Sequence, residues 1–114
     1  MTYQEIATLI ESIGVPFAYY AFEEGTAQAP PFICFYYSES NDLPADNTNY
    51  GKIEHLIIEL YTDQKNFTLE KQVETALNTA GLVYTRDETY LSSERMFMEV
   101  FGADVCITEE INNG

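Results

Sequence analysis

Several strand-like segments of this sequence carry apolar side chains on both faces, and this pattern constrains the fold more than any other feature. Successive side chains of a strand point to opposite faces of its sheet. Residues 15–22, 32–37 and 96–107 each place aromatic or aliphatic side chains at both odd and even positions. In the second segment, the two sets are Ile33 and Phe35 against Phe32, Cys34 and Tyr36. A sheet of such strands needs cover on both faces, or it leaves an apolar surface of the kind that marks protein contacts.

Two amphipathic helices are predicted to provide cover for one of these faces. Thr2 and Glu5 have the spacing of a capping box, and an apolar stripe follows them until Gly14. Asn66 is a suitable N-cap for a second helix that ends at Gly81. Two helices can cover one face of a five-stranded sheet, so the other face is left either to long loops or to other polypeptides.

The predicted fold class is α+β, in the order α-β-β-β-α-β-β, with two helices on one face of a mostly antiparallel sheet of about five strands. Further strands are expected at 52–61 and 82–86, and a bend or bulge at Gly102. Consecutive strands with short connections usually pair antiparallel. The length predicts a single domain over 1–114, with a frayed tail at 112–114.

A long polar segment between the second and third strands is predicted to be an exposed loop over 39–50. Loops of this length are more often functional than idle. We therefore expect it to contact a neighbouring subunit or another partner protein. The residues chosen for this contact are Asn41, Asp42, Asp46, Asn47, Asn49 and Tyr50.

The charge of the chain is strongly acidic, with nineteen Asp and Glu against five Lys and Arg and a net charge of −14. Proteins that grip phosphates use clustered basic residues, and none are clustered here. This argues against sequence-specific nucleic-acid binding and against binding to anionic membranes. The acidity fits solubility, or a surface that repels DNA passing close to it.

The sequence offers no constellation for catalysis, a cofactor or a metal. His55 is the one histidine, and its place in mid-strand predicts a structural or surface role. Cys34 and Cys106 lie in apolar runs, which predicts buried, reduced thiols and provides too few ligands for zinc. A calcium-loop spacing at 46–51 fails because Ile57 stands where the bidentate acid belongs. We expect a protein that is not an enzyme.

Two segments resemble a family of bacteriophage proteins. They are Glu59-Leu60-Tyr61-Thr62-Asp63 with the helix from Leu69 to Glu74, and Glu88-Thr89-Tyr90-Leu91 with Ser93-Glu94-Arg95. The chain resembles, over about residues 1–107, the tail terminator (tail completion, minor capsid) proteins of long-tailed phages and prophages. It departs from them at Phe67, where proline would be favoured as the first helical residue.

The resemblance implies a structural protein of the virion, present in the bacterial host cytoplasm before assembly. It implies a ring, usually of six copies, that caps the tail tube and joins it to the head. The implied partners are further copies of the chain, the major tail tube protein and a head-completion protein. Two alternatives stay open: a head-completion or neck connector protein, and an acidic host-directed module that mimics DNA.

Overall fold

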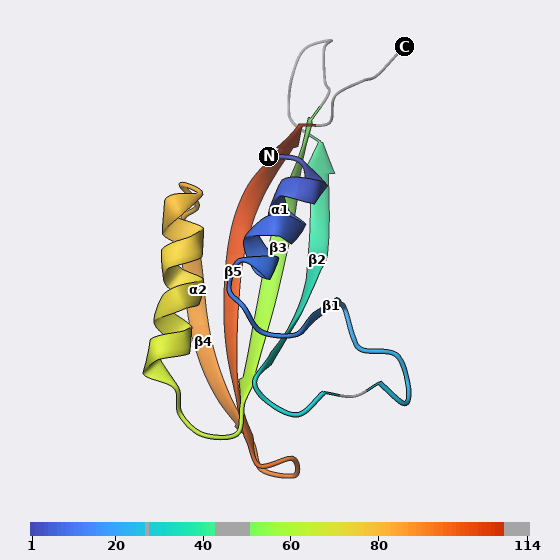
Figure 1. The fold of residues 1–114 in the computed structure, drawn as a ribbon. Coiled ribbons are helices and arrows are strands. Elements are labelled where there is room, and N and C mark those ends of the chain that lie inside the picture. Colours follow the sequence, from blue (N-terminus) through green and yellow to red (C-terminus); the bar gives the residue numbers. More distant parts are fainter. Residues whose placement is uncertain (27, 43–50, 109–114) are drawn as a thin grey trace.

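The computed structural model describes residues 1–26, 28–42 and 51–108, apart from the side chains of residues 40–42. The predicted element order and the α+β class are confirmed (Figure 1). The elements are α1 (Tyr3–Glu11), β1 (Phe17–Tyr19), β2 (Phe32–Asp42), β3 (Gly51–Thr62), α2 (Phe67–Thr79), β4 (Tyr84–Leu91) and β5 (Met96–Thr108).

The five strands form one sheet in the order β1-β2-β3-β5-β4. Three of the four pairings are antiparallel, as expected, whereas β1 and β2 pair in parallel, with Phe17 opposite Ile33. The parallel pair is possible because the connection between these strands returns the chain to the end of the sheet where β1 begins. The sheet is therefore mixed.

The strand boundaries differ from the prediction in three places. β1 is only three residues long and ends at Tyr19, and the next residue, Tyr20, has a φ of 68°, which is unusual for an aromatic residue. β2 continues to Asp42, so the exposed segment starts later than residue 39. β4 extends to Leu91, beyond the predicted end at residue 86. As an edge strand it pairs on one side only, and it carries exposed polar side chains that hid the strand pattern in the sequence.

The bulge expected at Gly102 is absent, and this part of the prediction is wrong. Gly102 pairs in regular register with Ile57 on one side and Thr85 on the other. A Cβ at position 102 would lie 3.2 Å from Thr85 Oγ1 and 3.3 Å from His55 Nε2. The glycine thus accommodates two neighbouring side chains, and the register shift lies in β2 instead, between Tyr37 and Ser40.

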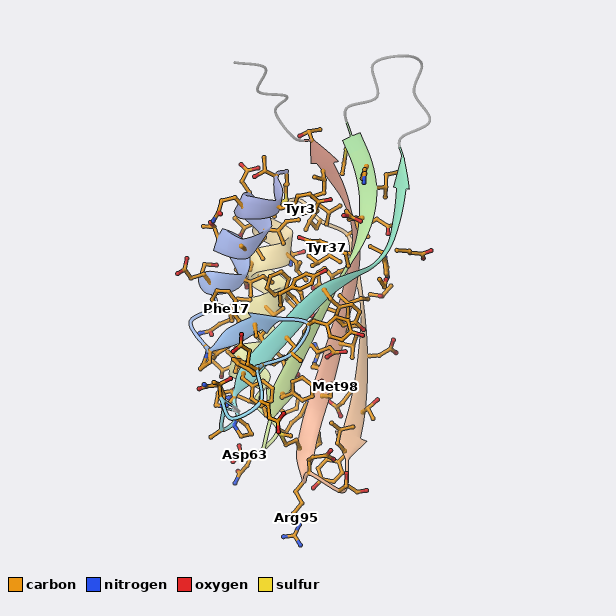
Figure 2. The ribbon with its side chains drawn as sticks, turned by 90° about the vertical axis from the view of Figure 1, so that its right-hand side faces the viewer. Tyr3, Phe17, Tyr37, Asp63, Arg95 and Met98 are labelled. Carbon is orange, nitrogen blue, oxygen red and sulfur yellow. The ribbon has the colours of Figure 1, made fainter. Side chains whose placement is uncertain are left out.

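Both helices lie on the same face of the sheet, and the core fills the space between them and the strands (Figure 2). The helices contribute Ile6, Ile10, Leu69, Val73 and Leu77, and Ile13, just after α1, joins them. The strands contribute Ile33, Phe35, Leu56, Ile58, Leu60, Phe101, Val105 and Ile107. Each strand residue in this set is separated from the next on its strand by an even number of positions, as a one-sided core requires.

Capping residues fix where the helices begin. Thr2 accepts a hydrogen bond from the Glu5 N–H, and Glu5 Oε1 accepts one from the Thr2 N–H at 2.8 Å, which completes the predicted capping box. Asn66 Oδ1 accepts from the Leu69 N–H at 2.9 Å. Gly81, with a φ of 76°, follows the end of α2.

Neither of the two described helices has the length and apolar character needed to cross a membrane.

Replacing the first cap tests its role in the fold. The substitution Thr2→Ala leaves N–H groups of the first turn without a partner and should lower the free energy of unfolding by about 1 kcal/mol. Urea denaturation followed by circular dichroism measures this change. Thr8→Ala, on the exposed side of the same helix, is the control and should cost little. Equal losses in the two variants would contradict the capping account.

Candidate functional site

The face of the sheet opposite the helices is the main candidate for a functional surface. We call it the open face. Figure 2 shows both helices on one side of the sheet, and within the described residues no helix lies on the other side. The apolar side chains of the open face are Phe32, Cys34, Tyr36, Ile53, Ile57, Tyr61, Met96, Met98 and Val100. Cys34 is buried and the others are half-buried, so part of the apolar surface of this face remains accessible.

The chain covers one corner of the open face itself. The connection from β1 to β2 lies over the start of β2, where the ring of Phe22 contacts that of Phe32 at a centroid distance of 5.5 Å. It borders an open pocket of about 320 Å³ that reaches Cys34 and Tyr61. Ile57, Met98 and Val100 do not line this pocket. Among the described residues, this connection covers one corner of the face, and Ile57, Met98 and Val100 at its centre stay half-buried.

A small polar cluster lies on the open face beside the apolar side chains. The Tyr61 hydroxyl donates to Glu59 Oε1 at 2.8 Å, and the Tyr36 hydroxyl donates to Glu59 Oε2 at 3.4 Å. Burial and then the hydrogen bond to Glu59 raise the pKa of Tyr61, while burial and the Glu59 charge raise the pKa of the Cys34 thiol. The Tyr61 hydroxyl and the Cys34 thiol therefore stay protonated at neutral pH. Glu59 accepts the hydrogen bonds of both tyrosine hydroxyls, and the cluster provides no activated nucleophile.

His55 and Cys106 also lie on the open face. His55 Nδ1 is 2.8 Å from Asp104 Oδ1 across the β3–β5 pair, which is the structural or surface role expected of it. Cys106 is exposed, so the prediction that both thiols are buried is wrong for this residue. Its strand carries core side chains at Val105 and Ile107, and Cys106 faces the opposite way.

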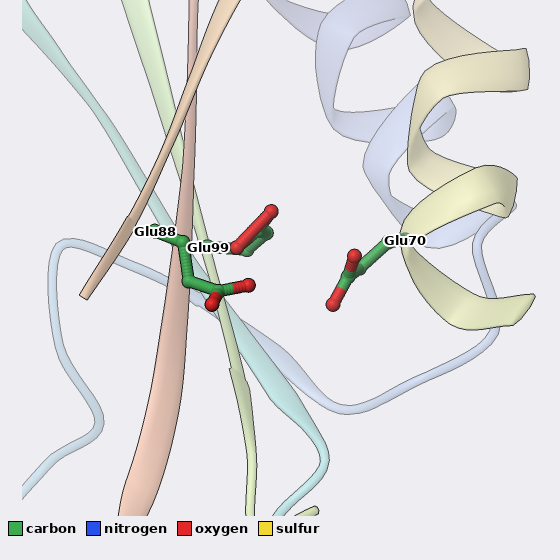
Figure 3. A group of neighbouring side chains, drawn as sticks. All are labelled: Glu70, Glu88 and Glu99. Carbon is green, nitrogen blue, oxygen red and sulfur yellow. The ribbon is translucent and has the colours of Figure 1, made fainter. Parts of the chain in front are cut away.

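A second candidate is a cluster of charged side chains at the start of α2. Figure 3 shows Glu70 of α2 turned towards Glu88 of β4 and Glu99 of β5, and carboxylate oxygens of all three lie within 4.8 Å of one another. Glu70 and Glu99 are both buried. Lys65 and Arg86 bridge these carboxylates. Lys65 Nζ lies 2.7 Å from Glu70 Oε2, and Arg86 Nε lies 2.5 Å from Glu99 Oε2.

This cluster fastens α2 to the edge of the sheet. Arg86 also pairs with Glu70 and with Glu74, and Lys65 also pairs with Glu88. Three carboxylates close together could hold a divalent cation, but the Lys65 ammonium already occupies the space between them. A buried ion pair of this kind costs several kcal/mol when one partner is removed, because the other charge stays buried. We therefore interpret the cluster as a structural connection between α2, β4 and β5.

Sequence reasoning missed this cluster, although a signal for it was present. Glu99 lies between Phe97 and Phe101 on the core face of its strand, and Glu70 lies next to the apolar stripe of its helix. A carboxylate at a core-facing position needs a cationic partner. The sequence could not identify that partner, because Lys65 and Arg86 meet only through the tertiary fold.

Two of the six loop residues chosen from the sequence lie within the described residues. Asn41 and Asp42 lie on β2, where they pair with Ile53 and Lys52 of β3. The predicted contact residues Asp46, Asn47, Asn49 and Tyr50 fall outside the described residues, as does the predicted tail at 112–114. The role proposed for the loop remains a prediction.

Comparison with known proteins gives a likeness in structure only. No model of a protein family matches this chain, and no curated protein matches it. A chain in the virion of a native gene transfer agent (GTA) particle shares the fold with a TM-score of 0.58. The superposition covers 91% of this chain and 90% of that chain, at 20% sequence identity. At this identity the likeness establishes a shared fold over nearly the whole of both chains.

The charged cluster predicts opposite pH dependences for two matched variants. Burial raises the pKa of Glu99, so on raising the pH above 4.5 the unfolded state ionises first and the wild type loses stability. The substitution Glu99→Gln removes this loss, and its stability relative to wild type should increase with pH. The hydrogen bond from Lys65 lowers the pKa of Glu88, so that carboxylate stabilises the fold above pH 4.5. Glu88→Gln should therefore be less stable than wild type at neutral pH, and the deficit should shrink in acid.

Urea denaturation of wild type and both variants between pH 4 and pH 8 measures these differences. The two substitutions are the same, so an effect of the amide itself would appear in both. Curves that run parallel for the two variants would contradict the assigned roles of burial and of Lys65.

Proposed function

We propose that this chain is a phage structural protein, a tail terminator that forms a ring, caps the tail tube and joins it to the head. The observation that carries the proposal is the open face, whose apolar side chains are half-buried, in a fold shared with a chain of a virion particle. An accessible apolar surface of this kind marks a protein contact. The resemblance of the segments around Tyr61 and Tyr90 to tail terminator proteins supports the same role.

The partners in this proposal are further copies of the chain, in a ring of six, the major tail tube protein and a head-completion protein. A ring joins two different patches of each subunit, so every subunit needs more apolar surface than its own core uses. In this role the chain binds its partners and has no catalytic step or cofactor. It is present in the host cytoplasm first and in the virion afterwards.

The charge of the chain fits a conduit for DNA. Of its five basic residues, Lys65 and Arg86 are held by four carboxylates in the charged cluster. The remaining three are dispersed along the chain. A wall with this balance repels phosphates instead of holding them, so DNA passing through the ring meets little friction.

The proposal is tested by binding to isolated phage parts. Purified, gold-labelled protein is mixed with tail tubes and, separately, with DNA-filled heads that lack tails, and the label is located by electron microscopy. A tail terminator should label one end of each tube. Label at the head vertex alone would favour a head-side connector instead. Absence of label from both would overturn a structural role in the virion.

A substitution at the centre of the open face should separate binding from folding. Met98 is half-buried on this face, and Met98→Glu places a charge in the apolar surface. We expect loss of tube-end binding, with a free energy of unfolding changed by no more than about 1 kcal/mol. Gln4→Glu is the control, since Gln4 is exposed on α1, on the other side of the sheet from Met98. Equal binding by the two variants would contradict a role for the open face.

A further inference from the structure

A ring needs a second contact surface besides the open face, and a groove between the two helices has the properties of one. The groove has a volume of about 970 Å³ and lies in the layer of helices that covers the core. Its apolar lining comes from Leu9 of α1, from Ile13 just after α1 and from Ala76 of α2, and Phe67 lines it at the start of α2. Phe67 is 71% exposed, which is unusual for so large an apolar side chain.

The charge of the groove differs from that of the rest of the surface. Lys71 lines it, and among the residues with a described position it forms no ion pair. Glu5 is the one carboxylate of the lining, and it accepts the capping hydrogen bond from the Thr2 N–H. On a chain of net charge −14, this apolar groove therefore presents an unpaired ammonium.

A complementary element lies at the opposite edge of the sheet. The connection after β1 forms a tight turn over residues 23–26, which we call the acidic turn. The Thr26 N–H donates to the Glu23 carbonyl oxygen at 2.9 Å, and Gly25 takes the left-handed φ of 86° that closes the turn. Glu23 and Glu24 are exposed, and neither forms an ion pair with any described residue.

The acidic turn is held in place by its own base. The Tyr20 N–H donates to the Phe35 carbonyl oxygen at 2.7 Å, and the ring of Phe22 packs on that of Phe32. The turn leaves the sheet at the β2 side, whereas α2 lies over the β4 side (Figure 1). A preformed turn loses little conformational entropy when it binds.

We propose that the acidic turn of one copy docks into the groove between α1 and α2 of the next copy. Lys71 pairs there with the carboxylates of Glu23 and Glu24, and Phe67 becomes covered. The contact joins two different surfaces, so repetition from copy to copy builds a ring or a helical array, and not an isolated two-fold dimer. This inference rests on the proposed ring, and it specifies which surfaces of each subunit meet.

The test is thiol cross-linking on the full chain in a Cys106→Ser background, where the remaining Cys34 is buried. One protein carries Thr26→Cys in the acidic turn, a second carries Gln72→Cys in the groove lining, and a third carries both, so that Lys71, Glu23 and Glu24 stay in place. A short bifunctional thiol reagent is added to concentrated protein and to protein bound at tube ends. The double variant should give a ladder of linked species, a mixture of the two single variants should give dimers only, and each single variant alone should stay monomeric.

Charge reversal provides an independent readout of the same contact. Lys71→Glu should weaken assembly at least about tenfold, and the added pair Glu23→Lys and Glu24→Lys should restore it, since the attraction is then reversed in sign. Lys52→Glu, at an exposed residue of β3, is the matched control and should assemble as wild type does. Circular dichroism melts confirm that each variant is folded.

The outcomes separate this inference from the proposed function. The groove contact would be overturned if the double variant did not cross-link and Lys71→Glu assembled as wild type does. Tube-end binding that persisted in that case would leave the proposed tail role intact. Cross-links in a single variant alone would overturn the head-to-tail geometry. Both proposals fail if the wild type does not bind tube ends and the double variant does not cross-link at high concentration.

Discussion

The one-sided packing of two short helices on a five-stranded sheet determines most of what this protein can do. The helices span 9 and 13 residues, and their buried side chains all meet one face of the strands. Burial of apolar area lowers the free energy whether the covering surface belongs to the same chain or to another. The second apolar face therefore favours association with another chain. The strands β3 and β5 carry this surface, and they are also the centre of the sheet, which gives the surface a firm base.

The charged cluster and the open face have different tasks in this arrangement. Lys65 and Arg86 hold α2 against β4 and β5, and so they fix the wall of the interhelical groove. The apolar surfaces outside the core, namely the open face and the groove, are then available for partners. In the proposed ring, a strongly negative chain gains from contacts that pair scarce cations such as Lys71 with acidic surface, because like charges otherwise repel.

Much of the fold could be predicted from the sequence, because local rules decide it. The capping box at Thr2, the Asn66 cap and the alternation along β3 each specify one structure, and all three are confirmed. The parallel β1–β2 pair could not be predicted, since it depends on the path of the intervening connection. The charged edge strand β4 and the pairing of Glu99 with Arg86 depend on neighbours distant in sequence. The bulge expected at Gly102 was wrong because this glycine makes room for the side chains of His55 and Thr85.

The central claim is that other polypeptides cover the open face in the working state. Met96 and Met98 lie on that face and report on its exposure, because oxidation of a methionine sulfur requires access of the oxidant. Oxidation by dilute peroxide, followed by mass spectrometry, compares the free protein with protein bound at tail-tube ends. The account predicts that both methionines are oxidised at least about tenfold more slowly after assembly, while Met1 serves as an internal reference. Equal oxidation rates at Met98 in the free and assembled protein would contradict it.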